Sequence, residues 1–300
     1  MTSFLTRCGT GAVASLIALV LLAAPRPAAA AQPCENPEVL RFSLVPAQDM
    51  LRELTYYDPI LGLLAKNTGK KIELILPRSY GSIIDGLLGK WVDIAVLGPE
   101  SYVLAQGRGA GVEVFGTYSR RAYGLQPAGP GYHSVLIVRK GSAFTSLPAL
   151  KGAVVALVDP ASTSGFLIPH AVFPRETGLP PLESYFSKVI VTGKHDLSTL
   201  AVAEGKADAA FVATYRFMEV VAAGKIKQED FTVLWTSPRL PQDPFVVRGA
   251  LCEPIKRAVA ETFLTAEHSE EGRKFLENIR SERFVPMSDG DYDIIRAVTK

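Results

Sequence analysis

Short apolar runs alternate with stretches of helical spacing along most of the chain. The apolar runs have the length and composition of buried strands, and they lie at 40–45, 71–76, 93–97, 135–139, 154–158, 189–192, 209–212 and 232–236. Apolar side chains recur at helical spacing at 50–66, 83–88, 255–264, 271–279 and 291–298. This alternation predicts an α/β fold with largely parallel sheets, and an all-helical segment after Pro254.

Two turn-rich segments interrupt this alternation, GLQPAGPG at 124–131 and SPRLPQDP at 237–244. They predict a discontinuous arrangement in which the chain leaves one lobe, builds a second and returns. The first lobe is then formed by residues 32–125 and 238–300, and the second by residues 126–237. Two sequential domains are the alternative that the pattern leaves open. A cleft between two lobes is a common place for a small-molecule site.

Residues 1–31 have the features of an export signal. Arg7 is the only early charge, an apolar stretch follows at 12–24, and alanines at 28–31 offer a cleavage site before Gln32. A retained membrane anchor is the alternative. The uncharged run is shorter than the ~20 residues that a membrane span prefers, and Pro25 and Pro27 follow it. We therefore expect a soluble, exported protein with the leader removed.

The cysteines and the charged residues limit the bonds and partners that are expected. Cys34 and Cys252 remain after cleavage, and in an oxidising compartment they are expected to form a disulfide, with two free thiols as the alternative. Without Arg7 and Arg26 the chain has 30 basic and 30 acidic residues, so a nucleic-acid partner is not expected. A small anion held in one local site remains compatible with this balance. The histidines are dispersed and CxxC is absent, so no metal site is expected either.

The strongest candidate for chemistry is the segment at 159–165, DPASTSG, which follows a predicted strand. The first N–H groups of a helix have no internal partner and carry the positive end of the helix dipole. The hydroxyls of Ser162, Thr163 and Ser164, next to Gly165, would add donors for an oxyanion. Plain helix capping is the alternative, because serine and threonine are preferred caps.

Other strand ends have a similar design. Tyr80 follows the strand at 71–76, Tyr132 precedes the strand at 135–139, and His195 with Asp196 follows the strand at 189–192. Glu100 lies in the first turn of the helix predicted after Gly98-Pro99, where a carboxylate favours the helix dipole. Taken singly, each of these positions is explained by a structural role.

An enzyme is not predicted. Ser164, His195 and Asp196 could be drawn as a triad, but the chain has no G-x-S-x-G elbow, and an adjacent His-Asp pair does not match the required orienting geometry. Phosphate-binding Gly-rich loops, HExxH and EF-hand spacings are also absent. We therefore expect no catalytic residue and no cofactor.

The runs YHSVLIVRK at 132–140, LKG at 150–152 and DPASTSGFLIP at 159–169 resemble the phosphate, phosphite and phosphonate solute-binding proteins of bacterial ABC importers. The segments at 93–99, 200–209 and 237–248 support the resemblance. It implies a type II periplasmic binding protein fold, with two α/β lobes joined by two hinge strands. It also implies that an oxyanion accepts hydrogen bonds from Ser162, Thr163 and Ser164, completed by Tyr80, Tyr132, His195 and Asp196.

One departure from the family concerns the substituent of the ligand. Relatives often place an acidic residue in the turn after the strand that follows Asp208, where this chain has Ala213-Thr214-Tyr215. Fewer carboxylates there disfavour an aminoalkylphosphonate. Asp196 is the first candidate, and Glu100 the second, for the acceptor that would require a proton on the ligand.

The prediction is a monomeric receptor for phosphite, a phosphonate or phosphate that delivers its ligand to the membrane permease of an ABC importer. The alternative is a periplasmic sensor of arsenic or phosphorus oxyanions that presents its ligand state to a histidine kinase.

Overall fold

Two β-sheets form the centre of the described chain. The computed structural model describes residues 33–46 and 50–299, so the predicted leader at 1–31 lies outside the described part. The first sheet has the order β13-β4-β12-β3-β1-β2. Its strands are β1 (Val39–Leu44), β2 (Lys71–Leu74), β3 (Ile94–Val96), β4 (Val112–Arg120), β12 (Phe245–Arg248) and β13 (Ser281–Val285).

The second sheet repeats the central order of the first. It runs β10-β6-β9-β7-β8 and contains β6 (Ser134–Arg139), β7 (Val154–Leu157), β8 (Lys188–Val191), β9 (Ala209–Ala213) and β10 (Phe231–Thr236). In each sheet three parallel strands adjoin one antiparallel strand, which enters from the other sheet. That strand is β12 in the first sheet and β6 in the second.

The chain crosses between the sheets through the two segments that are rich in glycine and proline. These crossings contain β5 (Gly131–Tyr132) and β11 (Leu240–Pro241), which pair antiparallel with Leu240 opposite Tyr132. Both connections between the sheets therefore lie side by side.

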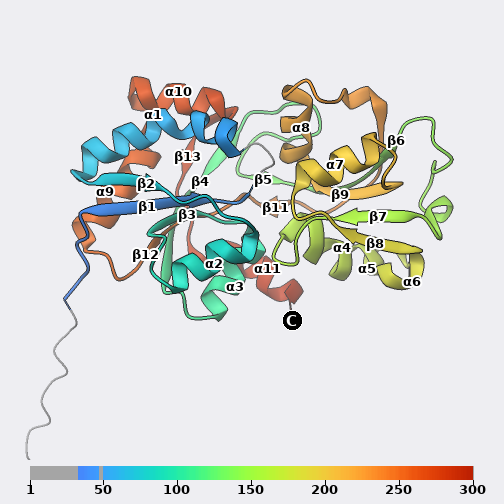
Figure 1. Ribbon diagram of the computed structural model, residues 1–300, viewed down its shortest axis with the longest axis horizontal. Coiled ribbons are helices and arrows are strands. Elements are labelled where there is room, and N and C mark those ends of the chain that lie inside the picture. The colour runs from blue at the N-terminus through green and yellow to red at the C-terminus, as the bar shows by residue number, and fades with distance from the viewer. Residues whose placement is uncertain (1–32, 47–49, 300) are drawn as a thin grey trace, which may run out of the picture. The chain divides into compact units, whose positions relative to one another are not determined.

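Helices cover both faces of each sheet (Figure 1). On the first sheet, one face packs against α1 (Met50–Thr68), α9 (Glu253–Leu264) and α10 (Glu270–Asn278), and the other against α2 (Tyr80–Leu88) and α3 (Pro99–Gly107). On the second sheet, α7 (His195–Ala203) and α8 (Thr214–Ala222) cover one face. The other face packs against α5 (Phe173–Thr177) and α6 (Leu182–Tyr185), next to α4 (Ile168–Ala171). Burying apolar area on four sheet faces stabilises the fold at about 25 cal/mol per Å².

The last helix, α11 (Asp293–Thr299), joins parts of both halves. Its Ile295 is fully buried in a cluster with Tyr132 from the first crossing and Ile168 from α4. Single turns of 3-10 helix occur at Pro148–Leu150, Gln228–Asp230, Ala266–His268 and Asp289–Tyr292. No helix of the described residues is both long and apolar enough to cross a membrane.

Cys34 and Cys252 form a disulfide with a Cα–Cα distance of 4.7 Å. The bond ties the start of the described chain to the residue before α9. Beside it, Glu35 forms an ion pair of 2.6 Å with Arg248, whose guanidinium also contacts the fully buried Asp93 at 2.8 Å. These contacts fix the N-terminal segment to β3 and β12, far from the edge where the predicted site residues lie.

The all-helical expectation for the segment after Pro254 is wrong. β13 interrupts it and pairs antiparallel with β4, Phe284 lying opposite Tyr118. Glu282 and Arg283 are exposed, so the segment lacks the apolar run that marked the other strands. Residues 281–285 are extended because they pair with β4 at the edge of the sheet. The pattern of apolar residues within this segment therefore did not predict a strand.

Candidate functional site

Strand-to-helix turns of both sheets meet at one small buried cavity. Six of the seven predicted ligand-binding residues line it. The full lining is Val45, Tyr80, Gly98, Tyr132, Ser162, Thr163, Ser164, His195, Tyr215 and Asp243. We call this space the hydroxyl cavity, because most of its polar groups are hydroxyls.

The Ser-Thr-Ser segment enters the cavity at the start of a helical run. Thr163–Leu167 forms one turn of π-helix that continues into α4. Ser162 is the N-cap, and its Oγ accepts a hydrogen bond of 3.2 Å from the backbone N–H of Gly165. A methyl group on Gly165 would overlap the side chain of Val158, so only glycine lets this turn pack closely on β7.

The hydroxyls of Ser162 and Thr163 act as acceptors toward the protein backbone. Thr163 Oγ1 accepts a hydrogen bond of 2.7 Å from the N–H of Glu100 in α3, and Ser162 Oγ accepts from Gly165. A hydroxyl whose oxygen accepts from an N–H still has its own O–H to donate. Both hydroxyls can therefore donate to an anion while they also satisfy the backbone.

Elements of the two sheets contact each other around the cavity. The Glu100–Thr163 hydrogen bond joins α3 to the Ser-Thr-Ser turn, and Ser101 Oγ donates to the carbonyl of Ala161 at 2.7 Å. These contacts bring the N-terminus of α3, with Gly98, against the Ser-Thr-Ser segment. Thr163 therefore belongs both to the cavity and to the contact between the sheets.

His195, the first residue of α7, is a neutral donor. Its Nδ1 accepts the backbone N–H of Ala213 at 3.2 Å, which places the ring hydrogen on Nε2, 3.4 Å from Ser162 Oγ. Burial, together with the positive charge of Arg216, lowers the pKa of His195 to about 3. Because Nδ1 faces an amide N–H rather than a carboxylate, the arrangement is unlike a catalytic triad.

Three tyrosines surround the cavity, and each is nearly fully buried. Tyr80 begins α2, where Ser79 and Ser82 form a reciprocal cap. Tyr132 comes from β5, and its ring contacts Tyr215 of α8 edge to face at 5.3 Å. Burial raises the pKa of Tyr80, Tyr132 and Tyr215, so all three remain neutral phenols.

Among the described residues that line the cavity, Asp243 provides the only carboxylate. It lies in the second crossing, is 1% exposed, and accepts a hydrogen bond of 2.6 Å from Tyr215 Oη through Oδ2. Burial raises the pKa of Asp243, although Arg216 and the Tyr215 hydrogen bond oppose this effect. A buried carboxylate in this position can accept a proton carried by an anionic ligand.

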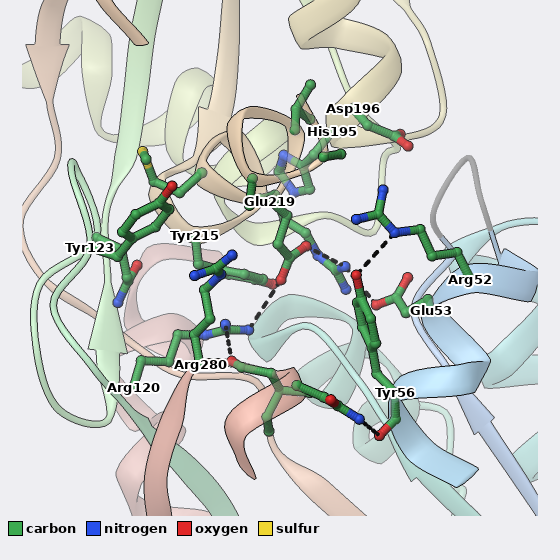
Figure 2. A pocket seen from close by; sticks show the side chains of 18 of the residues that line it. Arg52, Glu53, Tyr56, Arg120, Tyr123, His195, Asp196, Tyr215, Glu219 and Arg280 are labelled. Atoms are coloured by element: carbon green, nitrogen blue, oxygen red, sulfur yellow. Dashed lines mark hydrogen bonds and ion pairs between the residues drawn. The ribbon is translucent and has the colours of Figure 1, made fainter. Parts of the chain in front are cut away.

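The two acceptors predicted from the sequence lie elsewhere. The carboxylate of Glu100 accepts a hydrogen bond of 3.1 Å from Thr299 Oγ1 in α11, and Glu100 does not line the hydroxyl cavity. Asp196 is among the residues around a neighbouring, larger cavity (Figure 2). Only His195 of the adjacent His-Asp pair lines the hydroxyl cavity.

Sequence reasoning missed Asp243 and Tyr215. Both residues lie at positions of the kind that marked the other candidates, namely a strand end and a crossing between the sheets. Asp243 lies in the second crossing, and Tyr215 follows a strand end. A search of both crossings for carboxylates would have found Asp243.

The cavity suits an anion without using a cationic side chain. No lysine or arginine is among its lining residues, and its donors are hydroxyls, a neutral imidazole N–H and backbone amides. Neutral donors of this kind bind compact anions in water-excluded sites. Among the described residues, no cluster of three or more histidine, cysteine or acidic side chains is arranged to hold a metal ion.

Comparison with known proteins identifies the family of this chain. The family model for periplasmic substrate-binding proteins of phosphonate ABC transporters matches residues 42–292. The phosphate-import protein PhnD of Mycolicibacterium smegmatis is 31% identical over 279 residues, covering 87% of this chain and 85% of that protein. The phosphonates-binding periplasmic protein of Escherichia coli is 29% identical, covering 85% of this chain and 74% of that protein.

A solved structure matches most of the chain. It is the binding protein component of an ABC phosphonate transporter from Pseudomonas aeruginosa, with a TM-score of 0.78 and 26% identity over 88% of this chain and 86% of that chain. The predicted fold, a type II periplasmic binding protein fold, is thereby confirmed. The family match over most of its length and the identity to PhnD show that this chain belongs to the periplasmic substrate-binding proteins of phosphonate ABC transporters.

Proposed function

We propose that the hydroxyl cavity captures one small tetrahedral oxyanion, namely phosphite, a phosphonate or phosphate, and that the protein delivers it to the permease of an ABC importer. One observation carries the proposal. A single buried cavity combines the Ser162–Ser164 turn, a neutral His195 N–H donor, three phenols and one carboxylate, with no basic side chain in its lining.

The donors would hold the oxygen atoms of the ligand. Ser162, Thr163 and Ser164 present hydroxyls, Thr163 and Ser164 also present backbone N–H groups, and His195 presents Nε2–H; the N–H of Ser162 donates to the carbonyl of Asp159 at 2.8 Å. Each hydrogen bond to a charged group contributes ~1.5–3 kcal/mol net. Four or five of them give a binding free energy of about −8 kcal/mol or better after the cost of association, which is micromolar or tighter.

Asp243 would supply selectivity. Its carboxylate can accept a hydrogen bond from a ligand that carries a proton, as the monoanions of phosphite and phosphate do. A fully ionised anion such as sulfate offers no proton, and its charge would meet the buried carboxylate directly. We therefore replace Asp196 and Glu100 by Asp243 as the proposed acceptor.

The predicted lobes give the cavity a way to open. We infer that residues 32–125 with 238–300 move against residues 126–237 about the paired strands β5 and β11. Tyr80 and Gly98 come from the first of these lobes, and Ser162–Ser164 and His195 from the second. An anion that contacts both sides binds the closed state better and shifts the population toward it.

The remaining parts of the proposal concern how the protein works in the cell. We infer that it is exported with removal of residues 1–31, acts as a monomer and catalyses no reaction. The relatives are transport proteins, and they give no support to the sensor alternative.

The test is calorimetric titration of residues 32–300 with phosphite, methylphosphonate, phosphate, arsenate and sulfate. It is repeated on the double variant Ser162→Ala with Thr163→Ala. The matched control is Thr145→Ala with Ser146→Ala, an exposed pair of the same composition away from the cavity.

Binding of at least one phosphorus oxyanion at micromolar or lower Kd is expected, with no detectable sulfate binding. The site variant is expected to lose about 100-fold in affinity, since two charge-assisted hydrogen bonds are removed. The control should bind as the wild type does. A site variant within twofold of wild type would refute the site assignment.

A further inference from the structure

A second and larger cavity adjoins the hydroxyl cavity. Its volume is about 150 Å³, compared with about 10 Å³ for the hydroxyl cavity. His195 and Tyr215 line both spaces, so they form the wall between them. As it stands, the hydroxyl cavity has room for about one water, so it must widen around any oxyanion, and the adjoining larger cavity is the nearest free space for a substituent. A longer substituent would have to pass His195 and Tyr215 and enter the larger space.

Basic side chains outnumber acidic ones in the lining of this larger space, which we call the arginine cavity. Figure 2 shows Arg52, Arg120 and Arg280 beside it. Its basic lining residues are Arg52, Arg120, Arg121, Arg216, Lys225 and Arg280, and its acidic ones are Glu53, Asp196 and Glu219. The sequence as a whole is almost balanced, with 32 basic and 30 acidic residues. A concentration of positive charge at one cavity is therefore a local feature and does not follow from composition.

Two of these arginines are buried and held by aromatic rings. Arg120 is 5% exposed, and its guanidinium carbon lies 4.5 Å from the ring centre of Tyr118 and 4.2 Å from that of Tyr215. Arg216 is 8% exposed and lies 5.2 Å from the ring centre of Tyr215. Stacking of this kind fixes the plane of a guanidinium, which leaves its N–H edge to bind oxygen atoms.

Two acidic residues near these arginines form ion pairs with them, although Glu53 Oε2 is buried without a hydrogen-bond partner among the described residues. Arg216 donates to Glu53 at 2.7 Å and to Glu219 at 2.9 Å, and Glu219 lies 3.6 Å from Arg120. Arg120 donates through Nη1 to the carbonyl of Ile279 at 3.2 Å. Its buried Nε has no hydrogen-bond partner among the residues that the structure describes. A buried donor without a partner is unusual, and the described lining also holds one buried acceptor without a partner, Glu53 Oε2.

The mouth of the cavity adds further positive charge. The guanidinium of Arg280 lies over the ring of Tyr123 at 4.6 Å, and Arg52 and Arg121 are exposed at the same opening. An ammonium group entering here would meet six basic lining residues against three acidic ones, and Glu53 and Glu219 each already form an ion pair with Arg216. A carboxylate or a second phosphoryl group would instead find guanidinium donors in the geometry that suits them.

We propose that the arginine cavity receives the substituent of the ligand and selects phosphonates whose substituent ends in an anionic group. This inference rests on the proposed function, since it requires the phosphonate itself to be held by the Ser-Thr-Ser turn. Arg120 is the main partner of the anionic end, and Arg280 assists at the mouth. A phosphonate with a carboxylate two or three carbons from phosphorus is the ligand class that this arrangement fits.

The test compares three ligands of matched length on the wild-type protein: 3-phosphonopropionate, propylphosphonate and 3-aminopropylphosphonate, with methylphosphonate as the reference. We expect 3-phosphonopropionate to bind at least about tenfold more tightly than propylphosphonate, as one charge-assisted contact gives. The amine should bind more weakly than propylphosphonate. Because no variant is needed, this comparison does not depend on the folding of a mutant.

Variants then assign the effect to residues. Arg120→Gln and, separately, Arg280→Gln should reduce the preference for 3-phosphonopropionate over propylphosphonate. Arg280→Gln should leave methylphosphonate affinity within twofold. The control Arg283→Gln removes the same charge from an exposed position outside the cavity and should change neither ligand.

The outcomes separate this inference from the proposed function. If methylphosphonate, phosphite and phosphate all fail to bind, the proposed function fails. If methylphosphonate binds but propylphosphonate or the amine binds as well as the carboxylate, only the arginine-cavity inference is overturned. An equal loss for every anion in Arg280→Gln would also overturn it, because the arginines would then act only by long-range attraction.

Discussion

The hydroxyl cavity and the arginine cavity share a wall and differ in every other respect. The first is small and buried and has neutral donors with one carboxylate. The second is larger, has a mouth lined by exposed arginines, and is rich in charge. Positive charge is therefore absent from the lining of the proposed oxyanion site and abundant beside it.

The two cavities would therefore recognise different parts of a ligand: the hydroxyl cavity the oxyanion, and the arginine cavity a negatively charged substituent. Neutral donors bind the oxygen atoms of a ligand, and the buried carboxylate binds a proton that the ligand carries. The hydroxyl cavity therefore selects a ligand by the number of its oxygen atoms and by its protonation state. Arginines respond mainly to negative charge and bind carboxylate and phosphate groups alike. A site built only of arginines would not distinguish sulfate from phosphate, whereas the hydroxyl cavity has the groups to do so.

The largest effect is expected from Gly165→Ala. The new methyl group would collide with the side chain of Val158 and come within 3.1 Å of His195 Cε1, which would displace the Ser-Thr-Ser turn. The free energy of unfolding should fall by ~1–3 kcal/mol, as for overpacking, and methylphosphonate affinity by about 100-fold. Calorimetry and thermal denaturation measure both.

Gly62→Ala is the control for that prediction. Gly62 lies inside α1, and no heavy atom lies within 4 Å of the place that the added methyl carbon would take. The substitution should therefore stabilise the helix and leave binding unchanged. Wild-type affinity in Gly165→Ala would show that the turn does not hold the ligand.

Asp243→Asn tests whether Asp243 selects ligands that carry a proton, and this variant should have the next largest effect. The amide keeps the shape and can accept from Tyr215, but it no longer repels a fully ionised anion. Sulfate binding should become measurable, with an affinity gain of about tenfold or more, while phosphite affinity falls by about tenfold. Asp196→Asn is the matched control and should leave sulfate rejection intact. Unchanged rejection in Asp243→Asn would remove this residue from the selectivity mechanism.

His195→Asn should lower methylphosphonate affinity by about tenfold, the value of one charge-assisted hydrogen bond. The Asn Oδ1 can replace Nδ1 as acceptor for Ala213 N–H, but nothing replaces Nε2–H. The variant also has a pH signature. The pKa of His195 is about 3 in the folded protein and 6.5 as the ordinary value, so the unfolded state binds the proton first as the pH falls.

Stability due to neutral His195 is therefore complete above pH 6.5 and is lost as the pH falls toward 3, by up to ~1.4 kcal/mol per pH unit. Denaturant unfolding of His195→Asn should show a shallower decline than the wild type over this window. Parallel curves for the two proteins would contradict the assignment of a buried neutral imidazole.

The smallest effect is expected from Glu53→Gln, which addresses the arginine cavity. The glutamine side chain keeps an acceptor for Arg216 but removes a negative charge beside the arginines. Methylphosphonate affinity should change by no more than about threefold, while the preference for 3-phosphonopropionate over propylphosphonate should increase. A reduced preference would argue against the charge model. Glu282→Gln, exposed on β13, is the control.

Most strands of the second sheet were predictable because they are apolar runs, whereas β4 and β12 of the first sheet were not among the predicted strands. Each parallel strand of the second sheet's centre, such as 209–212, is apolar along its length, so it stands out from the helices around it. β13 was not predictable for the opposite reason, since it carries exposed Glu282 and Arg283 and depends on pairing with β4.

The candidate site was predictable where its chemistry is local. Ser162, Thr163 and Ser164 are adjacent, and their association with a helix start can be recognised without a structure. Asp243 differs because it gains its role only when the second crossing meets Tyr215, 28 residues earlier in the chain. The burial that makes its carboxylate selective arises from packing of both sheets, which no local pattern records.

The most direct test of the account is a crystal structure of the protein with methylphosphonate. We predict that the phosphonate oxygens lie in the hydroxyl cavity, within about 3.2 Å of Ser162, Thr163, Ser164 and His195 Nε2, with one oxygen on Asp243. A phosphonate group bound instead among Arg120, Arg216 and Arg280, with the Ser-Thr-Ser turn making no contact, would contradict it.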